Sequence, residues 1–407
     1  MISKSLLTLF SFCALACCIT QTQAANIYVD AAAVGANNGT SWVDAYTNIH
    51  DAVADSNAMA GADNIYVASG YYVSTAPYVF TDAATFNGGM LYGFPTTLEN
   101  ISGTSPIMEV QATDLDVSWT DFRNSLSHIV ASVSGIRFNK CHFQGAMSGS
   151  VVARWCWLVR GAHCGFYDNR SMWTAGGIMA EDCDLVHIEQ CKFQGNITNA
   201  YGGAIQVNNP SSLATGVLGG FKCENSTFTR NAAARAGGAI AAKLTTSKLA
   251  NSVFHRNHSR FGGAIALACG PTMNAEMYMV NCTLFGNGAR IAGGGMMLFD
   301  WGAHLVQTEI HNSILWRNWA PPAPVLMKQV NRPPNIFTHS CVNGWGSLPW
   351  PGMANFPWNP NLMPNGDVLP FSPCVDSGAP GVNPTMLDIT MAPRVQGPSI
   401  DIGAFEQ

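Results

Sequence analysis

One short device recurs along the middle of this chain and constrains its fold more than any other feature. Five times an asparagine is followed, five to seven residues later, by a pair of glycines that leads into an apolar run. The asparagines are Asn169, Asn196, Asn231, Asn257 and Asn287, and the glycine pairs begin at Gly176, Gly202, Gly237, Gly262 and Gly293. Successive pairs lie 26, 35, 25 and 31 residues apart. Repeats of this length are typical of stacked coils, because one coil can bury its apolar face only against its neighbours.

The composition agrees with a stack of coils. Only 11% of the 407 residues are charged, against about 25% in an average soluble protein. A low charge suits strands stacked in register, where like charges would lie one above another. The net charge of −5 argues against a nucleic-acid partner and against a polybasic membrane patch.

The first 24 residues are typical of an export signal. Lys4 precedes an apolar run from Leu6 to Ile19, and small residues follow as far as Ala24 and Ala25. The run is too short for a transmembrane helix, so we expect residues 1–24 to be a signal peptide that is removed on export. No other stretch is long and apolar enough to be a transmembrane segment, which favours a secreted or surface-associated protein.

Each repeat can be drawn as strands joined by turns. Segments such as 280–285 alternate between polar and apolar residues as strands do. We expect the repeat asparagine to close a turn by adopting left-handed geometry and bonding its own backbone. The glycine pair would supply positive φ or a close approach between coils. The extra residues of the longer coils fall after the glycine strand, at 208–220, 269–276 and 300–304.

The cysteines are better explained by packing than by disulfides. Two columns precede the asparagines, one five residues back and one three residues back: Cys141, Cys164, Cys191, Ser226, Ser252, Cys282 and Ser313, then Phe166, Phe193, Phe228, Phe254, Leu284 and Leu315. The two columns share one parity and therefore one face of the strand. We expect this face to point inwards, with mostly free cysteines that pack as small apolar residues. A disulfide between Cys164 and Cys191 is left open.

The two ends differ from the middle. Ser41 and Asp44 resemble a capping box, and Tyr46, Ile49 and Val53 would share one face of a short helix that runs to about Asp55. We therefore expect an N-terminal cap with this helix at 25–75, β-helix repeats at 76–335 and a C-terminal cap at 336–407.

Both ends also carry a family resemblance. The pieces Ile27-Tyr-Val-Asp and Asn64-Ile-Tyr-Val-Ala, with the closing pieces Ser372-Pro-Cys-Val-Asp-Ser-Gly and Asp401-Ile-Gly-Ala-Phe-Glu, resemble secreted bacterial right-handed parallel β-helix proteins with a choice-of-anchor Q type C-terminal region. The repeated Gly-Gly-Ala-Ile and Phe-x-x-Asn motifs are similar to the repeats of chlamydial-type polymorphic outer-membrane proteins. The resemblance implies an all-β, pectin-lyase-like right-handed parallel β-helix that is exported to the cell surface or beyond. It implies no single reaction, because one fold hosts many functions.

Arginines gather in the repeat turns and are the most distinctive polar feature. They are Arg170, Arg230, Arg235, Arg256, Arg260, Arg290 and Arg317. In a stack of coils they would form two columns along one edge, with about 4.8 Å between coils. Such columns favour an anionic partner, and a uronate-rich polysaccharide would supply carboxylates for bidentate pairing. The plainer alternative is that these arginines bond turn carbonyls and keep the edge soluble.

Other residues are candidates for stacking on sugars or for catalysis. Trp173 and Trp301 lie in or beside the repeats and would suit the apolar face of a sugar ring, or would simply pack in turns. A lyase or a glycoside hydrolase would need a base or paired carboxylates, and the candidates are Asp168, Asp182, Asp184, Asp300 and His304. Acidic loops are also common as simple solvated surface. No cofactor is expected apart from calcium, for which the spacing of Asp182 and Asp184 is suitable.

Our leading hypothesis is therefore a secreted or cell-surface β-helix that acts as an adhesion or envelope scaffold. Its partner would be a polysaccharide or another envelope component, bound through the arginine-lined edge. The alternative is a polysaccharide lyase or glycoside hydrolase with a site in the loops between Asp168 and Asp300. The enzyme predicts that Asp182, Asp184 or Asp300 faces an arginine across a groove, whereas the scaffold predicts scattered carboxylates and no groove.

Overall fold

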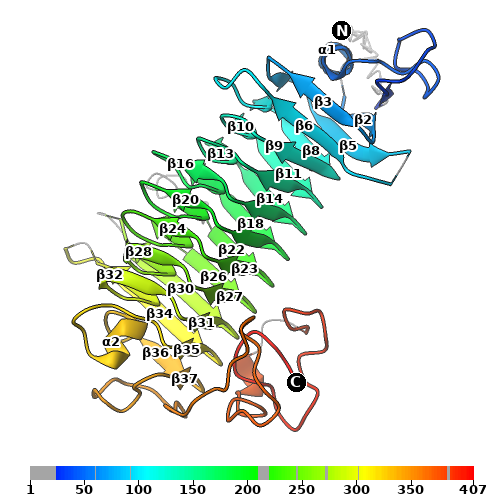
Figure 1. Ribbon diagram of the computed structural model, residues 1–407. Coiled ribbons are helices and arrows are strands. Elements are labelled where there is room, and N and C mark those ends of the chain that lie inside the picture. Colours follow the sequence, from blue (N-terminus) through cyan, green and yellow to red (C-terminus); the bar gives the residue numbers. More distant parts are fainter. Residues whose placement is uncertain are drawn as a thin grey trace, which may run out of the picture.

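The protein is an elongated stack of coils (Figure 1). The computed structural model describes residues 24–59, 61–91, 93–209, 220–243, 246–270, 274–300, 302–382 and 386–407. Residues 1–23 of the expected signal peptide lie outside the described residues, and so does Trp301.

Within the described residues, four parallel sheets run along the stack with twelve, eleven, nine and five strands, here called sheets A, B, C and D. Sheet A holds, in spatial order, β1 (Asn26–Val29), β2 (Asp63–Ala68), β5 (Ala84–Met90), β8 (Asp114–Ser118), β11 (Gly135–Asn139), β14 (Leu158–Ala162), β18 (Leu185–Glu189), β22 (Gly220–Glu224), β26 (Thr246–Ala250), β30 (Ala275–Val280), β34 (Val306–His311) and β36 (Ile336–Thr338). Sheet B holds β3 (Tyr71–Ser74), β6 (Thr96–Asn100), β9 (Thr120–Arg123), β12 (His142–Gln144), β15 (Gly165–Tyr167), β19 (Lys192–Gln194), β23 (Thr227–Thr229), β27 (Val253–His255), β31 (Thr283–Phe285), β35 (Ile314–Trp316) and β37 (Cys341–Val342).

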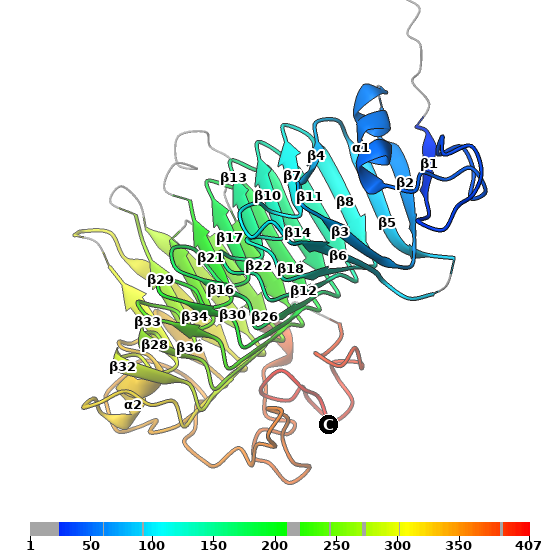
Figure 2. The same ribbon diagram turned by 45° about the horizontal axis from the view of Figure 1, so that its top comes forward.

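Sheets C and D complete the coils. Sheet C holds β4 (Tyr78–Phe80), β7 (Met108–Gln111), β10 (Ile129–Ser132), β13 (Val151–Arg154), β17 (Ile178–Glu181), β21 (Ile205–Asn208), β25 (Ile240–Lys243), β29 (Ile265–Ala268) and β33 (Met296–Phe299). Sheet D holds β16 (Arg170–Ser171), β20 (Ile197–Thr198), β24 (Ala232–Ala233), β28 (His258–Phe261) and β32 (Gly288–Ala292). Figure 2 shows sheet C as a continuous surface from β4 to β33.

A full coil visits the sheets in the order C, A, B and D. The chain passes through β17, β18, β19 and β20 and then returns to sheet C at β21. Connections between parallel neighbours in one sheet are right-handed, so the fold is the right-handed parallel β-helix that the sequence predicts. The strands extend from Asn26 to Val342, which is a wider range than the 76–335 expected for the repeats.

The inward-facing columns of the core are those expected from the sequence. Aromatic rings from sheet B stack along the axis with centroids 4.6 to 4.9 Å apart in the series Phe122, Phe143, Phe166, Phe193, Phe228 and Phe254. The neighbouring column of Cys and Ser is also buried, and its members bond from coil to coil: the amide of Cys191, for example, donates to Ser226 Oγ over 3.1 Å. All ten cysteines of the described residues are free and buried, so the prediction of packed thiols is confirmed.

The repeat asparagines form a buried ladder. Each side-chain amide nitrogen donates to the side-chain oxygen of the next asparagine over 2.9 or 3.0 Å, through Asn169, Asn196, Asn231, Asn257, Asn287 and Asn318. The expected left-handed geometry of these asparagines is wrong. The positive φ belongs to the residue before, as at Arg230 (φ 56°) and Arg256 (φ 54°). This turn leaves the asparagine side chain pointing inwards, where it bonds the next coil and not its own backbone.

The glycine pairs supply both the positive φ and the close approach between coils that the sequence suggested. Gly237, the first of its pair, has φ +67°, and Gly238 packs so tightly that an added Cβ would lie 2.1 Å from the carbonyl oxygen of Gly263. Because a side chain would separate neighbouring coils at this point, glycine is required there.

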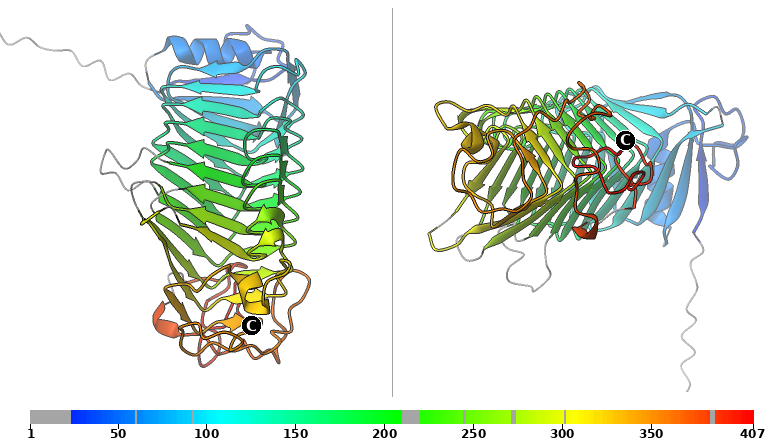
Figure 3. Two further views of the ribbon diagram at one scale, coloured as in Figure 1. Left: turned by 90° about the vertical axis from the view of Figure 1, so that its left-hand side faces the viewer. Right: turned by 90° about the horizontal axis from the view of Figure 1, so that it is seen from below.

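A helix covers the first coils, but it begins later than expected. Helix α1 spans Ile49–Ala58, and its N-cap is Asn48, whose side chain accepts from the amide of His50. Ser41 and Asp44 do bond each other, yet they close only a turn, and Tyr46 forms a bridge with Val29 ahead of the helix. Figure 3 shows α1 lying across the end of the stack.

The opposite end carries the short helix α2 (Val325–Gln329) and a long C-terminal segment. Neither α1 nor α2 is long and apolar enough to cross a membrane, and no other helix in the described residues is. The described residues of 343–407, here called the tail, lie at the last coils (Figure 3) and contact strands of sheet B. Ile314, Trp316 and Cys341 of sheet B form a second apolar cluster with Val368, Cys374 and Ile402 of the tail.

Candidate functional site

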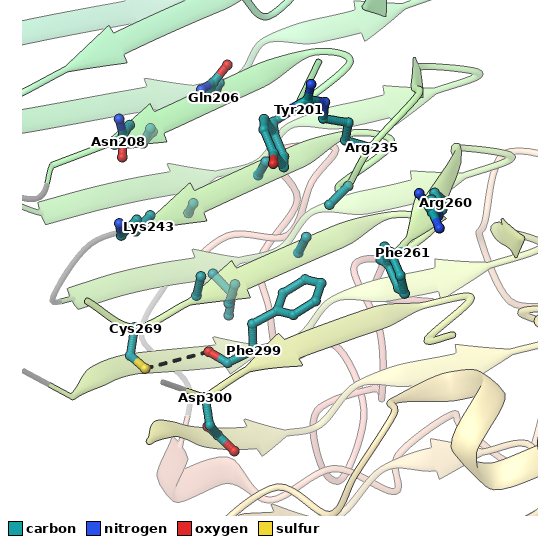
Figure 4. Close-up of a pocket in the computed structure, with 17 residues that line it drawn as sticks. Tyr201, Gln206, Asn208, Arg235, Lys243, Arg260, Phe261, Cys269, Phe299 and Asp300 are labelled. Atoms are coloured by element: carbon teal, nitrogen blue, oxygen red, sulfur yellow. Dashed lines mark hydrogen bonds between the residues drawn. The ribbon is translucent and has the colours of Figure 1, made fainter. Parts of the chain in front are cut away.

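The outer face of sheet C is hollowed between β21 and β33. In each four-residue strand the second and fourth side chains point outwards, since alternate residues face opposite sides of a sheet. The second positions of β25 and β29 are Ala241 and Ala266, which lie side by side in the register. Because these side chains are only methyl groups, they leave a hollow of about 860 Å³ above them (Figure 4).

One wall of this groove comes from the part of each coil where sheet D ends and the chain leads into sheet C. Tyr201, Arg235 and Arg260 are exposed on three successive coils. The guanidinium carbon of Arg235 lies 5.4 Å from the centroid of the Tyr201 ring, and that of Arg260 lies 5.4 Å from the centroid of the Phe261 ring. These distances are those of cation–π pairs, so each arginine is held beside an aromatic ring.

A further aromatic contact joins this wall to the outer face of sheet C, which forms the floor of the groove. Phe261 packs edge-on against Phe299, the last residue of β33, with ring centroids 5.7 Å apart. Figure 4 shows Tyr201 and Arg235 together on one side of the strands, with Phe261 and Arg260 on the following coil. The groove therefore offers ring faces and guanidinium groups along the same line.

Polar side chains come from the strands themselves. Asn208 and Lys243 occupy the fourth positions of β21 and β25, and Gln206 occupies the second position of β21. The side-chain oxygen Oε1 of Gln206 is buried and has no hydrogen-bond partner among the described residues. A hydroxyl donor from a ligand would satisfy this oxygen.

Asp300 closes the downstream end of the groove. Its Oδ1 accepts from Arg332 Nη2 over 2.8 Å and from the amide of Val306 over 2.8 Å. The carboxylate is therefore neutralised by an ion pair, and the groove keeps the positive charges of Arg235, Arg260 and Lys243.

The predicted arginines do lie in columns, but only one column meets the groove. In one column Arg235 follows β24, and Arg260 and Arg290 lie within β28 and β32 of sheet D on the next two coils. Arg230, Arg256 and Arg317 each precede a ladder asparagine at the end of a sheet B strand, and Gly286 interrupts this column between Arg256 and Arg317. Arg170 stands apart at the start of β16. Only Arg235 and Arg260 line the hollow.

The arginines outside the groove still affect their surroundings. The pKa of His255 is lowered to about 4, first by burial and then by the charges of Arg256 and Arg230. The pKa of His258 is lowered by burial and by Arg290. This edge of the stack is therefore electropositive, which agrees with the preference for an anionic partner that the sequence suggested.

The candidate catalytic residues are not brought together. Asp168 lies at the turn between β15 and β16, whereas Asp182 and Asp184 lie between β17 and β18, at the edge where sheet C leads into sheet A. Asp300 follows β33, and His304 precedes β34. The groove that the enzyme hypothesis required is present, but of the five candidates only Asp300 lines it, and Asp300 is paired with Arg332.

The remaining predictions concern a metal ion, Trp173 and Trp301. In the described part of the chain, no group of three His, Cys, Asp or Glu residues is arranged to hold a metal ion. Trp173 is 78% exposed in the loop before β17. Trp301 is outside the described residues, and no role is tested for it.

Several groove residues were not anticipated from the sequence. They are Tyr201, Gln206, Asn208, Lys243, Phe261 and Phe299. A usable signal was present, because the residue before the glycine pair is Tyr201 in one coil and Phe261 in another. The small floor residues were visible too, as alternating alanines in 239–242 and 264–266, but alternation alone does not say which face is hollow.

Comparison with known proteins adds short or distant likenesses. Residues 225–243 match the Chlamydia polymorphic membrane protein repeat, and no curated protein matches the chain. Among solved structures, the chain is similar to the pectate lyase Pel9A, with 11% identity, a TM-score of 0.40 and coverage of 95% of this chain and 98% of that one. It is also similar to the catalytic domain of a GH87 alpha-1,3-glucanase in complex with tetrasaccharides, with 10% identity, a TM-score of 0.35 and coverage of 72% and 65%. The parallel strand ladder by itself defines the β-helix.

Proposed function

We propose that this β-helix is an exported or cell-surface scaffold that binds an acidic polysaccharide chain in the groove on sheet C. The observation that carries the proposal is the line of Arg235 and Arg260 beside aromatic rings above a floor of small residues. The polymorphic membrane protein repeat at 225–243 and the expected signal peptide support a place in the envelope or outside the cell.

The charge of the groove favours an acidic ligand. Three cationic side chains line it, while Asp300, also in the lining, is already paired with Arg332 at 2.8 Å. Arg235 and Arg260 stand on neighbouring coils, about 4.8 Å apart along the axis. This spacing is close to the length of one pyranose residue, so carboxylates along a uronate chain can meet successive guanidinium groups.

The shape of the groove favours a sugar chain over a single small anion. The hollow of about 860 Å³ is lined by residues of β21, β25, β29 and β33, which follow one another along the axis of the stack. The rings of Tyr201, Phe261 and Phe299 offer apolar faces to pyranose rings, and Gln206, Asn208 and Lys243 offer hydrogen bonds to hydroxyls and carboxylates.

Matched pairs of arginines allow a sharp test. The variant Arg235→Gln/Arg260→Gln removes two charges inside the groove, and Arg230→Gln/Arg256→Gln removes two charges from the same edge outside it. We expect calorimetry with polygalacturonate to show about thirtyfold weaker binding for the first variant, from about 1 kcal/mol per partly exposed ion pair. The second variant should bind almost as the native protein does, and neutral dextran should not bind at all. Equal losses in both variants would contradict a groove and indicate a diffuse charge effect.

The same mixtures test the enzymatic alternative. Absorbance at ~235 nm reports unsaturated uronates, which form when a base removes the proton next to the carboxylate and the glycosidic C4–O bond breaks, with the next sugar leaving as an alcohol. A reducing-end assay reports hydrolysis. We expect bound polymer without either product. Product formation that is lost on Asp300→Asn but kept on Asp182→Asn would instead identify the groove as a catalytic site.

A further inference from the structure

The groove does not end where the hollow ends. One coil upstream of β21, the outer face of sheet C is filled by Met179, which forms a buried apolar cluster with Val152 and Ala175. The outward second position is therefore alanine in β29 and β25, glutamine in β21 and methionine in β17. A chain that leaves the hollow in this direction must pass over an apolar shoulder.

An exposed indole stands at this shoulder. Trp173 lies in the loop that follows β16 of sheet D and leads into sheet C. Tyr201 and Arg235 follow β20 and β24 in the same way on the next two coils, and Arg260 lies within β28 on the third. Backbone bonds connect these loops from coil to coil: the amide of Asn199 donates to the carbonyl of Ser171, and the amide of Arg235 donates to the carbonyl of Ala200. Trp173 therefore continues the wall of the groove, and 78% of its surface is exposed.

We infer that Trp173 is a stacking platform that extends the binding groove upstream for a longer sugar chain. This inference rests on the proposed function and adds the length and direction of the ligand. Trp173 and Arg260 lie on coils that are three spacings apart, about 14 Å along the axis. A chain of roughly four pyranose residues is the shortest that spans both, since each residue covers about one coil spacing. The ligand is therefore an extended polymer that runs parallel to the axis, with acidic residues at the arginines and a ring face on the indole.

Chain length separates this platform from the arginines. The probes are galacturonate oligomers of two and eight residues, measured by calorimetry. A dimer can occupy the hollow but cannot reach Trp173, so Trp173→Ala should leave dimer binding unchanged. The same variant should weaken octamer binding about fivefold, in the range of aromatic stacking contacts.

Two further variants complete the test. Trp173→Phe keeps a ring face, so it should restore octamer affinity while losing the change in tryptophan fluorescence that the octamer causes. Trp358→Ala removes an indole that is 64% exposed on the tail, and it should affect neither oligomer. Equal effects of Trp173→Ala on dimer and octamer, or no effect on the octamer, would overturn the inference while leaving the arginine groove intact. If the native protein binds neither oligomer, the proposed function falls as well.

Discussion

At the scale of single residues, one buried histidine ties the stability of the stack to pH. His128 is 0% exposed and lies in the core beside Phe122 and Phe143, with ring centroids 5.9 and 5.8 Å away. Burial lowers its pKa from 6.5 to about 3, because the charged ring cannot be solvated there. In the folded protein this histidine stays neutral at pH values where the unfolded chain would already bind a proton.

The sign of the pH effect follows from this shift. Between pH 6.5 and 3 the unfolded chain binds more protons at this position than the folded one, so stability falls with falling pH. The loss is about 1.4 kcal/mol for each unit below 6.5. We expect His128→Leu to flatten the decline in the urea midpoint between pH 6.5 and 4.5. His142→Leu is the control, because its ring pairs with Asp121 and its pKa is raised; its loss should not flatten the decline. A native-like slope in His128→Leu would contradict this account.

The same scale shows what the sequence can and cannot predict. The column of Cys141, Cys164 and Cys191 was predictable, because a small residue at a fixed distance from a repeat asparagine can face only one side of the strand. The backbone conformation of the repeat asparagines was not predictable. Asparagine tolerates left-handed backbone in general, but here that conformation falls on Arg230 and Arg256, and only contacts between coils decide which residue of the turn adopts it.

At the scale of elements, the ends of the ladders are closed by side chains from the capping segments. Gln329 of α2 ends the asparagine ladder, accepting from Asn318 Nδ2 over 2.8 Å. Asn57 of α1 bonds the first strand of sheet C through the carbonyl of Val79, and Asn331 bonds both polar groups of Leu298 in the last strand. The side-chain amides of these three residues bond polar groups at the ends of the stack, where the strands would otherwise be open to pairing with another chain.

Removing the last member of the ladder should weaken the downstream end of the stack. Gln329→Leu removes the oxygen that accepts from the buried backbone amide of Asn318 and from its Nδ2, which keeps its bond to the carbonyl of Leu284. The lost bonds should cost about 1 to 3 kcal/mol. The expected result is a lower urea midpoint and faster hydrogen exchange in the last coils, with the coils near α1 unchanged. Lys328→Leu, one position earlier in the same helix, is the control and should leave both measurements close to native. Loss of protection along the whole stack would instead mean that the coils unfold as one unit.

The boundary of α1 shows a limit of reading elements from sequence. Ser41 and Asp44 have the spacing of a capping box and do bond each other, so the local chemistry was interpreted correctly. The helix nevertheless starts at Ile49, because residues before it pair with β1, where the amide of Tyr46 donates to the carbonyl of Tyr28. A contact between distant segments overrides the local signal.

At the scale of the whole molecule, the tail protects a side of the stack as well as its end. The amide of Ala404 donates to Thr283 Oγ1 over 3.1 Å, and Asn312 bonds the carbonyl of Ala379. Within the tail, Arg394 is 1% exposed and pairs with Glu406, and burial lowers the pKa of Arg394 and raises that of Glu406. The tail therefore has a buried ion pair of its own.

The reactivity of the thiols can be predicted because every described cysteine is free and buried. For a protein of residues 26–407, we expect Ellman's reagent to titrate ten thiols in denaturant without reductant, because no disulfide joins the ten described cysteines. In native buffer the reaction should be slow, since every thiol is buried. An Ile402→Asp variant, which disrupts the cluster around Cys341 and Cys374, should release those two thiols first. A count of eight or fewer in denaturant would contradict the absence of disulfides.

How much of the molecule could be predicted also depends on scale. The stack and its inward columns follow from repetition, because every coil repeats the same contacts. The groove does not, because it needs two small residues on adjacent coils and a wall from a different turn, and only the register brings Ala241 beside Ala266 and Arg260. The path of the tail has no repeat to guide it, so only the assembled structure shows that it contacts sheet B.

The asparagine ladder also indicates where residues can be inserted without altering the spacing of the coils. Its members are 27, 35, 26, 30 and 31 residues apart in the chain, yet every rung has the same length of 2.9 or 3.0 Å. The longest coil takes up its extra residues between the end of β21 at Asn208 and the start of β22 at Gly220. Insertions at that corner therefore leave the pitch of the stack untouched. New segments could be grafted there, next to the groove, without realigning any neighbouring coil.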